Sequence, residues 1–131
     1  MKKNILLLFI LILNIPSHSF AQKLIFCERV DVNGNPENVS DTFNIGTKGG
    51  FLQLLLKSEK GIDSHNAVID VYHIDENKKE IFESTIRVTV EPDFTWFKKE
   101  ITFHQSGNYH VYVYDEKDKL LGVGKVTINL K

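Results

Sequence analysis

Four histidines are the first candidates for chemistry in this chain. Beyond Ala21 they are His65, His73, His104 and His110. No two of them have the i, i+4 helical spacing or the close Cys-x-x-Cys type of spacing that metal sites favour. A small metal-dependent hydrolase would need at least two of these histidines to meet a carboxylate in a cleft. The spacing favours scattered surface histidines instead, so we expect no metal site and no cofactor.

Nucleophilic catalysis has equally little support. Cys27 is the only cysteine, and every histidine that could act as its base is distant in the sequence. No Gly-x-Ser-x-Gly turn is present to expose a serine nucleophile. The adjacent carboxylates of Asp75 and Glu76 lie in a charged turn, where water solvates them. The sequence therefore predicts no catalytic residue and a protein that is not an enzyme.

One segment has the composition of a calcium-binding loop. Oxygen-bearing side chains alternate along it, at Asp31, Asn33, Asn35 and Glu37. Hard cations require such a pattern. However, Pro36 stands at the glycine position of an EF-hand loop, and Thr42 stands where a bidentate glutamate is needed. Asn-Gly turns have the same composition for conformational reasons. We favour the turn and keep calcium binding by residues 31–37 as its alternative.

The strongest functional signal is a set of aromatic residues near the C-terminus. Residues 109–114 alternate between Tyr109, Val111 and Val113 and a second set of ring-bearing side chains. If the first set points into the core, the two-residue period of a strand places the second set outside. The candidate binding residues, including two from the final strand, are His110, Tyr112, Tyr114, Leu121 and Val123. Exposed apolar faces rich in tyrosine are typical of binding surfaces. Cross-strand pairing, or cover by another strand or loop, is the structural alternative.

Strand-like segments separated by turns must position these residues. The expected strands are residues 23–30, 41–45, 51–57, 67–74, 81–90, 94–104, 109–114 and 120–130. Turn signals recur about every ten residues, and seven or eight strands with that spacing are typical of an antiparallel sandwich or barrel. A short helix over residues 51–60 is an alternative, because Leu52, Leu55 and Leu56 fit a helical period.

Residues 106–113, Ser-Gly-Asn-Tyr-His-Val-Tyr-Val, resemble a strand of known sandwich domains. They are similar to the Gly-x-Tyr-x-Val strand near the end of many secreted bacterial immunoglobulin-like and fibronectin-type domains. The resemblance implies an all-β, antiparallel, immunoglobulin-like β-sandwich of seven or eight strands. It also implies that Tyr109 lies at a sheet corner, with its hydroxyl bonded to nearby backbone. The paired cysteines of antibody domains are absent, and such folds host many functions.

The segment from Met1 to Ala21 has the three parts of a secretory signal peptide. Lys2 and Lys3 form a positive start, residues 5–13 are apolar without a break, and Ser19 and Ala21 are small residues before the cleavage point. The apolar run is shorter than the ~20 residues that a membrane-spanning helix needs. We expect cleavage after Ala21 and one mature domain over residues 22–131.

The lone cysteine bears on how the mature chain is held. Cys27 follows Leu24, Ile25 and Phe26, whereas a lipid-modified bacterial cysteine follows small residues. We therefore expect no lipid anchor and a half-buried thiol within the first strand. An intermolecular disulfide is the alternative, because an oxidising compartment permits it. The expected location is secreted or periplasmic.

Composition then narrows the class of partner. The 131-residue chain has a formal net charge of −1, and cleavage after Ala21 would leave 14 basic against 17 acidic side chains. This balance argues against a nucleic-acid partner. We expect a non-catalytic module without a membrane span, which binds a protein partner, a cell-surface glycan or an envelope component. A homodimer through an edge strand is a further option. The alternative is a carbohydrate-binding module in which Trp96 and Phe97 stack on sugar rings.

Overall fold

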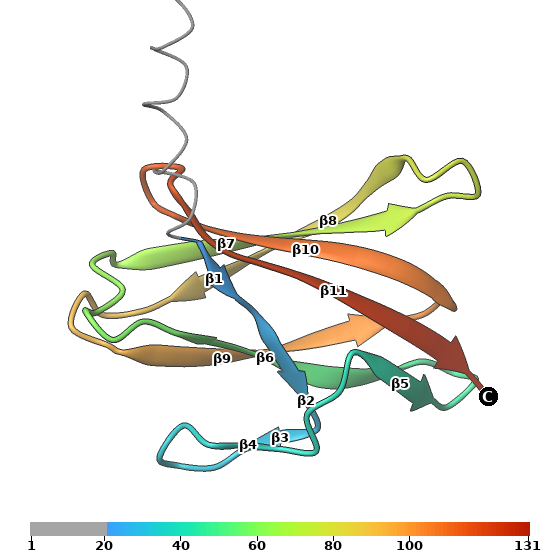
Figure 1. Cartoon of the computed structure of the whole chain (residues 1–131), viewed down its shortest axis with the longest axis horizontal. Helices are drawn as coiled ribbons and strands as arrows, with labels where there is room; N and C mark the ends of the chain where they lie inside the picture. Colours follow the sequence, from blue (N-terminus) through green and yellow to red (C-terminus); the bar gives the residue numbers. More distant parts are fainter. Residues whose placement is uncertain (1–20) are drawn as a thin grey trace, which may run out of the picture.

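The computed structural model describes residues 21–131, which form two β-sheets packed face to face (Figure 1). The segment expected to be a signal peptide lies outside these residues, apart from Ala21. Residues 21–131 contain no helix, so none of the described elements is a helix that could span a membrane. The expected immunoglobulin-like β-sandwich is confirmed, and the helical alternative for residues 51–60 is wrong.

The sandwich consists of a larger and a smaller sheet. The larger sheet contains, in order, β8 (Glu80–Thr89), β7 (Asn66–Ile74), β10 (Gly107–Asp115) and β11 (Leu120–Leu130), all antiparallel. Two short strands, β1 (Gln22–Lys23) and β5 (Thr42–Ile45), pair with β11 in parallel. The smaller sheet contains β2 (Ile25–Cys27), β6 (Gly50–Lys57) and β9 (Trp96–Phe103). A separate hairpin consists of β3 (Arg29–Val30) and β4 (Pro36–Glu37).

The first expected strand, over residues 23–30, is divided because its residues pair with strands of both sheets. β1 pairs with β11 in the larger sheet, and β2 pairs with β6 in the smaller one. Leu24, which lies between them, is buried in the core. Two glycines of β11 let this segment approach: a Cβ at Gly122 would lie 2.5 Å from Leu24, and one at Gly124 would lie 2.7 Å from Phe26. This crossing, together with the β3–β4 hairpin, explains why the structure has more strands than expected.

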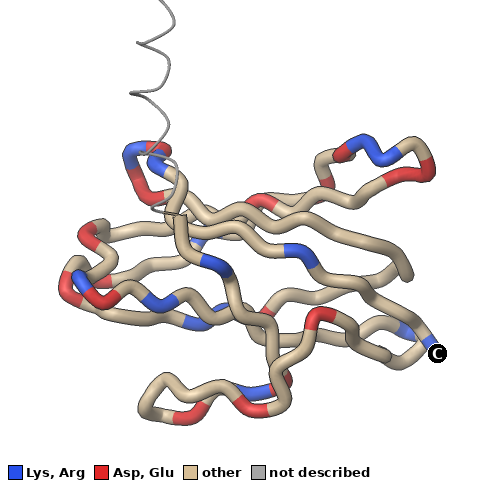
Figure 2. Tube along the Cα trace, in the orientation of Figure 1, with Lys and Arg blue, Asp and Glu red and all other residues tan. Residues whose placement is uncertain are grey.

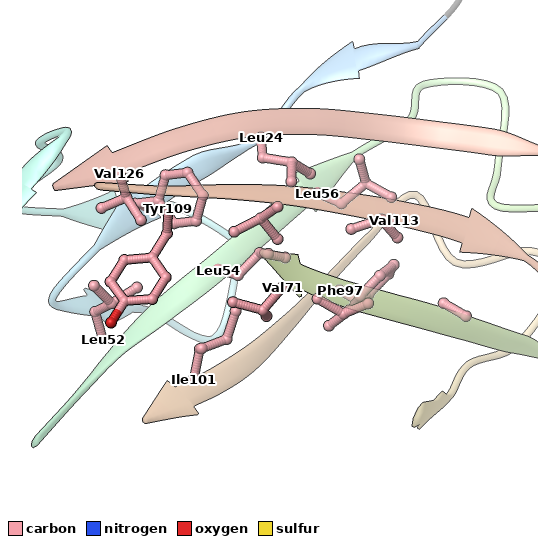
Figure 3. Packing of buried hydrophobic residues seen from close by; sticks show 14 of the residues in the cluster. Leu24, Leu52, Leu54, Leu56, Val71, Phe97, Ile101, Tyr109, Val113 and Val126 are labelled. Atoms are coloured by element: carbon pink, nitrogen blue, oxygen red, sulfur yellow. The ribbon is translucent and has the colours of Figure 1, made fainter. Parts of the chain in front are cut away.

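One hydrophobic core fills the space between the sheets (Figure 3). Its largest fully buried members include Leu52, Leu54, Leu56, Ile69, Ile101, Tyr109, Val111, Val113 and Ile128. A second, smaller cluster lies on the other side of β6, where Leu55 packs with Cys27, Val30 and Trp96. Strand β6 is therefore buried on both faces at Leu54, Leu55 and Leu56, whereas Phe51 and Lys57 are exposed. Burial on both faces accounts for this run of three leucines, which also fits a helical period.

Three hairpin turns share one aspartate arrangement. In each turn a carboxylate oxygen accepts the backbone N–H groups of the second and fourth residues after it, at 2.8 and 2.9 Å. The aspartates are Asp31, Asp75 and Asp115. The third residue after each has a positive φ, and these residues are Gly34, Lys78 and Asp118. The carboxylates thus close the turns that join paired strands.

Tyr109 occupies the sheet corner that the resemblance implies. Its hydroxyl donates a hydrogen bond to the backbone carbonyl of Gln105 at 2.8 Å. Its ring is fully buried and packs edge-on against Phe103, with the ring centroids 4.7 Å apart. Burial raises the pKa of Tyr109 to about 12. The contact fixes the start of β10, and β10 carries most of the candidate binding residues.

Candidate functional site

The outer face of the larger sheet carries the ring-bearing residues expected there. Tyr109, Val111 and Val113 are buried, and the intervening residues of β10 are partly exposed. His110, Tyr112 and Tyr114 therefore lie on the outer face, as the two-residue period predicts. Charged residues gather at the hairpin tips and are sparse along the strands of this sheet (Figure 2). The outer face thus presents rings together with a few charged side chains, among them Asp70, Glu80 and Arg87.

Neighbouring strands add two aromatic residues that sequence reasoning missed. The strand register places Tyr72 of β7 beside His110, and Phe82 of β8 beside Tyr72. The Tyr72 ring packs edge-on against Phe82 and Tyr112, with centroid distances of 5.7 and 5.5 Å. We call the surface formed by Tyr72, Phe82, His110, Tyr112 and Tyr114 the tyrosine face. The alternation of residues 67–74 was a signal for Tyr72, because Ile69 and Val71 point the other way.

Glu80 holds two members of the tyrosine face in place. Its Oε2 accepts a hydrogen bond from the Tyr112 hydroxyl and lies 2.6 Å from Nδ1 of His110. These side chains come from opposite sides of β7, so the carboxylate bridges over that strand. The Tyr112 hydrogen bond, followed by that of His110, lowers the pKa of Glu80. No pattern in the sequence points to Glu80, because its role depends on the register of β8.

The same hydrogen bond raises the pKa of Tyr112. Donation to the Glu80 carboxylate, together with burial, raises the pKa of Tyr112 to about 12. Burial also raises the pKa of Tyr114. The Tyr112 hydroxyl therefore keeps its proton to a higher pH than an ordinary tyrosine does, and its ring packs against that of Tyr72. This arrangement orders the rings on the tyrosine face.

A hollow of about 500 Å³ with a mixed polar and apolar lining adjoins the tyrosine face at His110. Lys78 of the β7–β8 turn and Lys125 of β11 line it, together with the carboxylate-bearing Asp41. Thr127 donates to Oδ1 of Asn108 at 2.7 Å within the same lining. Charges of both signs therefore border the rings on the side of β11.

The final strand contributes less to this face than expected. Val123 is partly buried and lies opposite Tyr112 in the pairing of β10 with β11. Leu121 instead packs against the core, so its expected place on the outer face is wrong. The reason is a register shift, in which Val113 pairs with Gly122 but Tyr114 pairs with Leu120. This shift leaves Leu121 as an extra residue that breaks the alternation.

The four histidines have different neighbours and do not meet. His110 contacts Glu80, and the His73 ring lies 5.1 Å from the ring of Tyr109. The other two, His65 and His104, are exposed. Within residues 21–131, no group of three His, Cys, Asp or Glu side chains could hold a metal ion. The convergence that a metal-dependent hydrolase needs is not found in the described part of the chain.

The sugar-stacking platform of the carbohydrate-binding alternative does not form. Phe97 is buried in the core with 5% of its surface exposed. Trp96 packs against the smaller cluster, and Gly34 lies so close that a Cβ there would be 2.7 Å from the indole ring. The β3–β4 turn thus covers part of the indole. Trp96 and Phe97 pack as structural residues, so this alternative lacks its platform.

The remaining candidates have structural roles. Asp31 binds the backbone of its own turn, and those hydrogen bonds, first of all that of Asn35, lower its pKa. Cys27 is fully buried rather than half-buried, and its Sγ lies 3.8 Å from the backbone oxygen of Gln53. Burial raises the pKa of this thiol. Raised pKa and burial both make a cysteine unreactive.

Comparison with known proteins leaves the family open. No protein-family model matches the sequence, and no curated protein matches it significantly. Among solved structures, a variant of the superoxide reductase (neelaredoxin) from Ignicoccus hospitalis is 9% identical, with a TM-score of 0.43 and coverage of 90% of this chain and 87% of that one. A CARDB domain from Pyrococcus furiosus, solved with two metal ions, is 14% identical, with a TM-score of 0.43 and coverage of 86% and 97%. At these scores neither likeness adds to what the strands themselves show.

Proposed function

We propose that this chain is a non-catalytic binding module that acts outside the cytoplasm, as a secreted or periplasmic protein. It recognises a protein partner of the cell envelope through the tyrosine face. One observation carries the proposal: five ring-bearing side chains from three adjacent strands remain accessible on a single sheet face. Tyrosine is enriched where proteins bind each other, because its ring buries apolar area while its hydroxyl bonds to polar groups.

The order within this face supports a binding role. Glu80 fixes Tyr112 and His110, and Tyr72 is held between Phe82 and Tyr112. Rings that are already fixed lose little conformational entropy when a partner docks. The cross-strand contacts also stabilise the sheet, yet Phe82 still exposes 56% of its surface. A partner would cover this remaining area.

Affinity capture with matched variants tests the proposal. The tagged mature chain is compared with a double variant, Tyr112→Ser with Tyr114→Ser, using envelope extract from the native host. The control is Phe51→Ser, which removes a ring that is 56% exposed on the smaller sheet. Circular dichroism first shows that all three proteins are folded.

We expect the same protein to be retained by the parent chain and by Phe51→Ser, and lost from the double variant. Equal recovery with the double variant would place the binding surface elsewhere. Recovery that withstands protease treatment of the extract but is lost with glycosidase treatment would identify a glycan and refute the protein partner.

A further inference from the structure

Strand β8 ends the larger sheet, and no other strand in residues 21–131 pairs with its outer edge. It is ten residues long, so a row of backbone N–H and C=O groups faces away from β7. Ile81 and Phe82 on this strand expose 49% and 56% of their surface. The edge therefore combines unpaired backbone with uncovered apolar side chains, and such edges add strands from other chains.

A bulge in β8 determines which of its residues share a face. The register with β7 shifts between Val71 and Tyr72, which leaves Glu83 as an extra residue. Outer-face positions are consequently even-numbered before Glu83 and odd-numbered after it. The outer-face residues are Glu80, Phe82, Thr85 and Arg87, and those directed to the core side include Ile81, Ile86 and Val88.

We propose that β8 pairs antiparallel with β8 of a second copy of this chain. Residues directly opposite each other in such a pair share a face. The bulge reverses the alternation along β8. The outer faces of the two copies therefore match along the strand when an outer residue before Glu83 in one copy lies opposite an outer residue after Glu83 in the other. The register that does this places Glu80 opposite Arg87 and Phe82 opposite Thr85. It also places Ile81 opposite Ile86 on the core side.

Charge and apolar character both fit this register. The twofold axis produces two Glu80–Arg87 pairs of opposite charge, and such cross-strand pairs stabilise a sheet. Glu80 binds His110 and Tyr112 through Oε2, so Oε1 is available to the guanidinium of Arg87. Ile81 gains an apolar neighbour from the other copy. The two most exposed apolar side chains of β8 are thereby covered or bordered by the second chain.

The dimer would join two tyrosine faces into one surface. Both copies of β8 lie at the centre of the combined sheet, and the outer faces of the two chains point to the same side. The inference does not depend on the proposed partner, because the purified chain alone should dimerise.

Sedimentation equilibrium of the purified mature chain tests the pairing. We expect a monomer–dimer equilibrium, and Arg87→Glu should weaken it by roughly tenfold or more, because two attractive pairs become repulsive. The control is Lys98→Glu, the same charge change at an exposed site of β9, which ends the smaller sheet. A chain that stays monomeric at all concentrations, or a dimer equally stable with Arg87→Glu, would overturn the proposal.

Engineered cysteines test the register itself. A Phe82→Cys chain mixed with a Thr85→Cys chain should form a disulfide-linked dimer, because opposite residues have Cβ atoms about 5 Å apart. Cys27 is buried and does not compete. The control mixture pairs Phe82→Cys with Thr89→Cys, which the register separates by four positions along the strand. Equal crosslinking in the two mixtures would contradict the register, and so would faster crosslinking in the control.

Discussion

Single side-chain hydrogen bonds anchor strand β10 to neighbouring segments. The Tyr109 hydroxyl donates a hydrogen bond to the carbonyl of Gln105, and the aromatic ring of Tyr109 is fully buried. Loss of this donor would remove a partly buried hydrogen bond, which lowers the stability of the fold. The Gly-x-Tyr-x-Val pattern predicts this contact because it is local in sequence. The Glu80 contacts were not predictable, because they join residues 30 and 32 positions apart.

Removal of the Tyr109 hydroxyl should therefore destabilise the fold. We expect Tyr109→Phe to lower the free energy of unfolding by about 1 kcal/mol, because a partly buried hydrogen bond to the Gln105 carbonyl is lost. Urea denaturation followed by fluorescence measures this. Tyr114→Phe, on the outer side of the same strand, is the control and should change stability by less than about 0.5 kcal/mol. Equal effects of the two changes would refute the corner contact.

The ionisation of Tyr112 should depend on Glu80. The pKa of Tyr112 is about 12 in the fold, above the ordinary value of 10.0. The protonated form is therefore favoured by folding, so its contribution to stability is present below pH 10 and is lost as the pH rises towards 12. Glu80→Gln removes the charged acceptor and should bring this pKa down.

Ultraviolet absorbance of the phenolate follows this titration, and subtraction of a Tyr112→Phe titration isolates Tyr112. The pKa of Tyr109 is also about 12 but arises mainly from burial, so Glu80→Gln should leave it in place. An unchanged Tyr112 titration in Glu80→Gln would show that the hydrogen bond does not form in solution.

Three hairpins share one turn geometry, but the residue with positive φ, the third after the aspartate, differs between them. Gly34 adopts the positive φ without strain, whereas Lys78 and Asp118 adopt it at φ 65°. Side chains disfavour this region because Cβ approaches the carbonyl. The turns themselves were predictable from Asp-rich and Asn-Gly sequences. The geometry that the three turns share was not predictable, because only the turn after Asp31 has a glycine at the third residue after the aspartate.

This comparison predicts a stabilising substitution. Lys78→Gly should raise the free energy of unfolding by about 0.5 to 1 kcal/mol, because glycine adopts positive φ without steric cost. Thermal unfolding followed by circular dichroism measures the change. Gly34→Ala is the opposite control and should destabilise, because its Cβ would meet the Trp96 ring. A lower melting temperature for Lys78→Gly would contradict the shared turn geometry.

Alternation predicted most strand faces, and it failed where the strands are irregular. His110, Tyr112 and Tyr114 follow the two-residue period and lie where it places them. Leu121 does not, because the pairing of β10 and β11 shifts at that point. The division of the first expected strand was also missed, since a segment that crosses between sheets has the same apolar sequence as one long strand. Bulges and crossings depend on the partner strand, which the sequence of one strand does not reveal.

Burial within the sandwich protects the lone cysteine. Cys27 lies in the smaller cluster and is fully buried. We expect no measurable reaction with a thiol reagent in the native protein and complete reaction in denaturant, because the thiol is reached only on unfolding. Thr85→Cys supplies an exposed thiol as the control. Rapid labelling of Cys27 without denaturant would contradict the sandwich packing around it.

The tyrosine face is the surface that should meet the proposed partner. Nuclear magnetic resonance of the isotope-labelled mature chain, titrated with the captured partner, locates that surface directly. We predict that the amide shifts that change most belong to β7, β8 and β10, on the strands that carry Tyr72, Phe82 and Tyr112. Changes confined to β6 and β9, or to the turn after Asp31, would contradict it.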